Sequence, residues 1–177
     1  MSDWRDEYLD EIRHSFRAQR TLAERAIAQL NDDELLRTLG EEDNSVAVIM
    51  KHVGGNLRSR WTEPFTTDGE KPDRNRDGEF VVDDDGAATV RAVWERGWSV
   101  LEQTLASLTR DDLGRELHIR GEPHSLIRAL ERSLTHTAQH TGQIVMLAKH
   151  WKGAAWQTLS IPRGESAKFL ARPPAQA

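Results

Sequence analysis

Residues 126–151 read LIRALERSLTHTAQHTGQIVMLAKHW, and this segment carries the clearest structural pattern in the chain. Its apolar residues recur at gaps of three and four, which places them along one face of an α-helix. Ser125 precedes the segment as a candidate N-cap, and Gly153 follows it as a stop signal. The pattern therefore predicts one long amphipathic helix that begins after Ser125 and ends near Gly153.

The same periodicity occurs in three further segments, which span residues 3–30, about 45–62 and about 87–108. In the second of them, Gly54 and Gly55 each cost about 1 kcal/mol relative to alanine, which indicates that another helix or a ligand approaches closely there. Helices that each have one apolar face bury these faces against one another. The sequence therefore predicts an all-α fold, a four-helix bundle.

The segments between these helices give weaker signals. Residues 65–85 show little apolar periodicity, and so long a connection between the second and third helices is expected to cross the end of the bundle or to cover a site. Residues 33–39 are expected to add a short turn of helix. Residues 115–124 alternate briefly around Gly121, which predicts a small hairpin.

The composition bounds the class of protein. The chain has 177 residues, of which 37% are hydrophobic and 30% charged, so we expect a single domain over residues 1–170 and a disordered tail over 171–177. The chain contains no cysteine, which excludes disulfides and thiolate metal sites. Its net charge of −5 and the lack of a basic patch argue against nucleic acid as a partner. Because neither a long apolar run nor a secretory signal is visible, we expect no membrane association and a cytoplasmic location.

Three of the seven histidines are candidate metal ligands. His136 and His140 are four residues apart on the fourth helix, so both rings project from one face and can reach one ion at about 2.0–2.1 Å. They lie at the margin of the apolar face, where imidazoles serve either as ligands in a cleft or as hydrogen-bonding residues of the boundary layer. If the second helix brings His52 to the same place, the three form a site with open coordination positions.

Residues one turn away from these histidines are candidates for orienting the rings. Asn56 follows His52 and Gln143 follows His140 at the required spacing, although a solvated role remains the alternative for both. The other histidines are expected to be surface or boundary residues, and three tryptophans are expected to anchor the core or an interface. These residues are His14, His118, His124, His150, Trp61, Trp94 and Trp98.

Several enzyme classes lack support in the sequence. In the His136–His140 motif, Thr137 stands where the H-E-x-x-H proteases have their glutamate. A di-iron bundle needs a Glu-x-x-His motif on each of two helices, and only one occurs, at residues 11–14, which argues against this class. Phosphate-binding loops, dinucleotide fingerprints and serine-hydrolase elbows are also missing. The sequence assigns no general base or other catalytic residue.

Several blocks of the chain together resemble a bacterial family of uncharacterised small proteins within the DinB/YfiT-like superfamily. The blocks are DNSVAVIMKHVGGN at 43–56, RSRW at 58–61, TTDGEKP at 66–72, RDGEF at 76–80, LTHTAQHTGQI at 134–144 and LSIPRG at 159–164. The block at 134–144 is similar to the last-helix motif of the superfamily. The resemblance extends over nearly the whole chain.

The resemblance implies a four-helix bundle that is the mirror variant of the simple up-and-down topology. It implies that His52, His136 and His140 hold a divalent metal ion, with zinc or nickel expected first and iron or copper as alternatives. Homodimers are expected, as is a small-molecule substrate that includes a low-molecular-weight thiol. The implied activity is a transferase acting through a metal-bound thiol, or a hydrolase acting through metal-bound water. The alternatives are a non-catalytic metal-binding bundle in stress response and a site whose histidines only pack.

Overall fold

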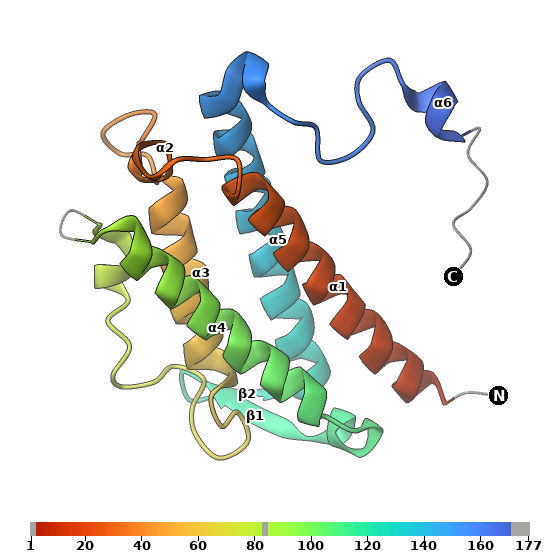
Figure 1. The fold of residues 1–177 in the computed structure, drawn as a ribbon. Coiled ribbons are helices and arrows are strands. Elements are labelled where there is room, and N and C mark those ends of the chain that lie inside the picture. Colours follow the sequence, from red (N-terminus) through yellow and green to blue (C-terminus); the bar gives the residue numbers. More distant parts are fainter. Residues whose placement is uncertain (1–2, 83–84, 171–177) are drawn as a thin grey trace.

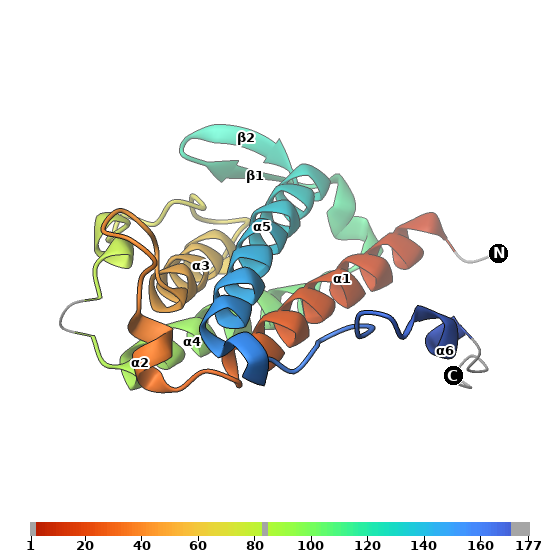
Figure 2. The same ribbon diagram turned by 90° about the horizontal axis from the view of Figure 1, so that it is seen from above.

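Four long helices form about half of the chain, which the computed structural model describes over residues 3–82 and 85–170 (Figure 1). They are α1 (Trp4–Ile27), α3 (Val46–Trp61), α4 (Ala87–Ser107) and α5 (Leu126–Lys152). Helix α3 packs against α4 and α5, and α1 packs against α5 on the other side (Figure 2). The predicted mostly helical chain is confirmed, with helix boundaries close to those expected. The predicted tail 171–177 lies outside the described residues.

Short elements connect the long helices. They are α2 (Asp32–Leu36), η1 (Asp77–Phe80), η2 (Arg110–Gly114), β1 (Glu116–Ile119), β2 (Glu122–Ser125), η3 (Gly153–Ala155) and α6 (Ser166–Leu170). In these described residues no helix combines the length and the apolar character that a membrane span requires.

The small hairpin predicted at 115–124 is present, because β1 and β2 pair as antiparallel strands within the mostly helical chain. Glu116 pairs with Ser125 at the open end, and Leu117 and Ile119 are buried beneath the hairpin. Arg120 and Gly121 form the two-residue turn with φ angles of +58° and +75°, the conformation that matches the twist of a tight hairpin. The weak alternation at 115–124 therefore marks real strands.

Local capping interactions explain where α3 and α5 begin. The side chain of Ser45 accepts a hydrogen bond from Val48 N, and that of Ser125 accepts one from Arg128 N, each at 3.2 Å. Each serine thus satisfies one of the backbone N–H groups that a helix leaves unpaired at its start. Both N-caps agree with the sequence prediction.

The core lies between the four helices, and the three predicted tryptophan anchors are in it. Trp61, Trp94 and Trp98 are exposed by 2% or less. Two glycines bring α3 and α4 into contact: a Cβ on Gly54 would lie 2.5 Å from Val93 O, and one on Gly97 would lie 2.3 Å from Gly54 O. The close helix approach expected from the glycine pair is therefore present at Gly54.

The long connection between α3 and α4 is fastened to its surroundings. Lys51 of α3 donates to Gly78 O at 2.9 Å and pairs with Asp85, which holds η1 beside α3. Nearer the start of the connection, Asp68 accepts hydrogen bonds from the backbone N–H groups of Arg120 and Gly121 at 2.8 and 2.7 Å. The connection is therefore attached to α3 through Lys51 and to the hairpin through Asp68.

Candidate metal centre

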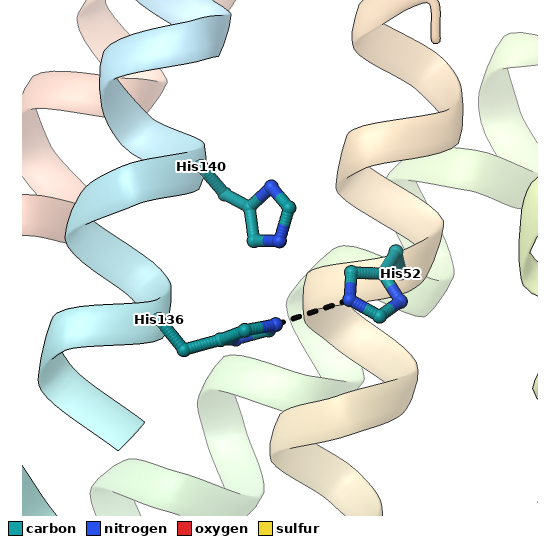
Figure 3. A group of neighbouring side chains, drawn as sticks. All are labelled: His52, His136 and His140. Carbon is teal, nitrogen blue, oxygen red and sulfur yellow. Dashed lines mark hydrogen bonds between the residues drawn. The ribbon is translucent and has the colours of Figure 1, made fainter. Parts of the chain in front are cut away.

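Three histidines from two helices meet between α3 and α5 (Figure 3). His52 comes from α3, and His136 and His140 come from successive turns of α5. Their ring centroids are 4.6–5.1 Å apart, and one nitrogen from each ring lies within 4.8 Å of the other two. The structure therefore brings together all three candidate ligands named from the sequence.

The spacing of the nitrogens fits a single cation. Two ligands of a tetrahedral ion at about 2.0–2.1 Å are roughly 3.3–3.4 Å apart. Nε2 of His52 lies 3.1 Å from Nε2 of His136. At this distance two lone pairs repel each other unless a proton or a metal ion lies between them. Three imidazoles in this arrangement could hold one metal ion.

Glu79 of η1 orients the His52 ring. Its Oε2 lies 3.0 Å from His52 Nδ1, and the glutamate is only 6% exposed. Because an ionised carboxylate can only accept a hydrogen bond, Nδ1 carries the proton and donates it. Nε2 of His52 therefore presents its lone pair towards α5, as a metal ligand requires.

The Glu79 carboxylate is in turn held by Arg74. Arg74 donates from Nε to Oε1 and from a terminal nitrogen to Oε2, both at 2.8 Å. Burial alone raises the pKa of Glu79, but the hydrogen bonds from Arg74 and His52 outweigh it, so the pKa lies below its usual range. A Cβ on Gly55 would lie 2.2 Å from Glu79 Oε1, so the second glycine of the pair leaves room for this carboxylate.

The two histidines of α5 differ in their partners. His140 Nδ1 lies 2.7 Å from Gln143 Oε1, so Gln143 orients this ring as the spacing predicted. His136 Nδ1 is buried and has no hydrogen-bond partner among the described residues. Burial, followed by the neighbouring rings of His140 and His52, lowers the pKa of His136 to about 3. Burial also lowers the pKa of His140. Both rings are therefore neutral near pH 7 and available as ligands.

Two expectations about neighbouring residues were wrong. Asn56 does not orient His52, because Glu79 already occupies Nδ1; Asn56 lines a pocket beside the histidines instead. His124 is not a surface or boundary residue but is 3% exposed, because it faces inward from β2. His14, His118 and His150 are exposed as expected.

Sequence reasoning missed Glu79 and its neighbour Phe80, whose ring centroid lies 5.0 Å from that of His52. Both residues belong to a segment without apolar periodicity, so no helical pattern pointed to them. One signal was available, since Gly55 lies inside a helix where glycine needs a reason.

The structure thus defines a helical protein in which three imidazoles from two helices converge. The chain belongs to the family described as "Protein of unknown function (DUF1572)", which matches residues 3–165. No curated protein and no solved structure matches the chain. The family description gives no activity, so the function is argued from the site.

Proposed function

We propose that this protein binds one divalent metal ion through His52, His136 and His140 and is a metal-dependent enzyme. The observation that carries the proposal is the convergence of three ring nitrogens within 4.8 Å of one another. Imidazole nitrogen suits zinc and nickel, which we propose first, and also iron and copper.

A divalent ion held by three neutral imidazoles keeps its double positive charge and lowers the pKa of a thiol or water at an open position. The chain's own residues prepare the site for this chemistry. Glu79 and Gln143 fix the rings of His52 and His140, so that unprotonated nitrogens face the centre. We propose two reaction types, a transferase that uses a low-molecular-weight thiol and a hydrolase.

Access to the site supports catalysis rather than a purely structural role. Structural zinc sites use four protein ligands and are closed, whereas catalytic sites use three and keep a position open. Here three histidines converge, and a pocket lined by His52 and His136 opens beside them.

We also propose that the chain belongs to a wider superfamily. The sequence blocks resemble the DinB/YfiT-like superfamily, and on that ground we propose that α1, α3, α4 and α5 form its mirror-variant bundle. We propose homodimers on the same resemblance, and a cytoplasmic location on the lack of cysteine in the sequence. Light scattering of the purified chain tests the dimer.

Metal content tests the binding proposal. We expect tag-free protein to contain close to one equivalent of zinc or nickel by elemental analysis, and His136→Ala to lose it. His150→Ala serves as the matched control, because His150 is exposed on the same helix. Unchanged metal content and thermal stability in His136→Ala would refute the ligand role.

A turnover screen tests catalysis separately. The metal-loaded protein is incubated with electrophiles and several bacterial thiols, and in parallel with simple esters and amides. Turnover that exceeds that of the metal-free protein supports a transferase in the first assay and a hydrolase in the second. No turnover in either assay would favour a non-catalytic metal-binding protein.

A further inference from the structure

An arginine-rich pocket of about 220 Å³ lies directly beside the three-histidine cluster. His52 and His136 form the wall that faces the cluster, and Ile119 and Ala129 contribute apolar surface. The remaining wall contains five arginines, namely Arg60, Arg74, Arg76, Arg120 and Arg132. We call this hollow the arginine pocket. Its volume is small and suits a small molecule or one end of a larger one.

The positive charge of the arginine pocket is specific to this place. The whole chain has a net charge of −5, so the cluster does not follow from a generally basic surface. Among the described residues, two carboxylates form ion pairs with these guanidinium groups: Glu70 pairs with Arg60, Arg74 and Arg120, and Glu79 pairs with Arg74. Five guanidinium groups against two carboxylates leave a positive surplus.

The arginines have different roles in this network. Arg74 is 4% exposed in its side chain, and its nitrogens are committed to Glu70 and Glu79. Arg60 donates to Gly69 O at 2.7 Å and to Glu70. By contrast, Arg76 and Arg132 are exposed and have no carboxylate partner within the described part of the chain, and the Arg76 guanidinium lies over the Phe80 ring, 5.5 Å from its centroid. Arg132 is therefore the guanidinium most available to a ligand.

We propose that the arginine pocket binds the anionic group of the substrate, a carboxylate or a phosphate, and thereby places the rest of the molecule at the metal centre. This inference rests on the proposed metal site, whose function it deepens. A guanidinium offers two parallel N–H donors that match the paired oxygens of either anion. The ligand class is thus a small molecule with an oxyanion at one end.

The spacing on α5 places Arg132 beside the metal centre. Arg132 lies four residues before His136, so the two side chains are neighbours on one face of the helix. Cβ atoms at this spacing are about 5–6 Å apart. Because Arg132 and His136 line the same pocket of about 220 Å³, one small molecule can contact the arginine and the metal centre together.

Anion titrations of the metal-free protein test the arginine pocket without any contribution from a cation. The protein is freed of metal with a chelator, which is then removed by desalting. Inorganic phosphate and succinate are titrated into it separately by calorimetry. We expect saturable binding of at least one anion, and we expect Arg132→Gln to weaken that binding about tenfold. Arg128→Gln is the matched control, because Arg128 is an exposed arginine one turn earlier on α5 that does not line the pocket.

Each outcome decides a separate point. Binding of phosphate alone or of succinate alone identifies the oxyanion, and loss in Arg132→Gln but not in Arg128→Gln supports the proposal. The proposal is overturned if neither anion binds, or if both variants bind like the wild type. Zinc content of Arg132→Gln is measured in parallel. If Arg132→Gln contains normal zinc and binds the anion like the wild type, only the arginine pocket is refuted. If the wild type itself binds no zinc, the metal centre is refuted.

Discussion

Glu79 decides which nitrogen of His52 faces the neighbouring helix. The carboxylate accepts from Nδ1 at 3.0 Å and is itself held by two hydrogen bonds from Arg74. Partners of this kind fix the tautomer and direction of a metal-binding imidazole. The chain places this partner on η1, 27 residues from the histidine that it orients.

Replacement of Glu79 is expected to weaken metal binding while all three histidines remain. In Glu79→Gln the negative charge is lost, and we expect affinity for zinc to fall about 10–100-fold. A competition titration with a chromophoric chelator measures it. Glu70→Gln is the control, because Glu70 accepts from Arg74 at 3.0 Å but does not contact His52. Equal losses in the two variants would contradict a specific role for Glu79.

The buried His136 is expected to make the metal-free protein sensitive to acid. Its pKa falls from 6.5 in the unfolded chain to about 3 in the folded one, mainly because of burial. Between these two pKa values the unfolded state binds a proton that the folded state does not. The free energy of unfolding is therefore undiminished by His136 above pH 6.5 and decreases as the pH falls below it. Urea unfolding at several pH values should show a steeper loss in the wild type than in His136→Gln. If the free energy of unfolding fell equally with pH in the wild type and in His136→Gln, the burial of His136 would not be the cause of the acid sensitivity.

Sequence alone identified the histidines but not everything that orients them. His136, His140 and Gln143 lie within two turns of one helix, so their spacing is enough to predict a shared face. Asn56 satisfied the same local rule for His52 and was nevertheless the wrong partner. The correct partner comes from a loop, and no periodicity in the sequence links it to His52.

At the scale of elements, two glycines with different neighbours set the position of α3. A Cβ on Gly54 would meet the backbone of α4 at Val93, whereas one on Gly55 would meet the side chain of Glu79. Adjacent glycines thus serve two purposes, helix packing and space for the carboxylate beside His52.

Alanine at Gly54 is expected to destabilise the fold. Overpacking costs about 1–3 kcal/mol, and the contacted atom is backbone that cannot rotate away, so the penalty exceeds the roughly 1 kcal/mol that alanine contributes to a helix. Gly142→Ala is the control in α5, because a Cβ there meets nothing within 4 Å. We expect urea unfolding to show a loss in Gly54→Ala and a gain of about 0.5–1 kcal/mol in Gly142→Ala. A gain in both would contradict the close packing of α3 and α4.

Alanine at Gly55 is expected to act on the metal centre instead. The new methyl group displaces Glu79 and so removes the hydrogen bond to His52 Nδ1. We expect zinc affinity to fall about tenfold, as for other losses of an orienting partner. The same chelator competition measures it, with Gly142→Ala as the reference. Wild-type affinity in Gly55→Ala would show that Glu79 has room to move.

Elements with a local signal were predicted from the sequence, and the others were not. The N-caps at Ser45 and Ser125 and the strands at 115–124 follow from residues within a few positions of each other. η1 has no such signal, because Lys51 and Asp85 hold it from outside the segment. Its place in the fold depends on contacts that are distant in the sequence.

At the scale of the whole molecule, the packing of α3 beside α5 creates the candidate site. Amphipathic patterns predict that four helices bury their apolar faces, but they do not state which margins then face each other. The distribution of charge likewise cannot be read from the sequence alone. A chain of net charge −5 gathers five arginines around one pocket, and these come from α3, the α3–α4 connection, the hairpin and α5.

X-ray absorption spectroscopy of the zinc-loaded protein tests the central claim most directly, since it counts the imidazoles around the ion. We expect three histidine nitrogens at about 2.0–2.1 Å from one zinc per chain, and two in His52→Ala. A zinc shell made mainly of oxygen, or one unchanged in His52→Ala, would contradict the convergence of α3 and α5 on a single cation.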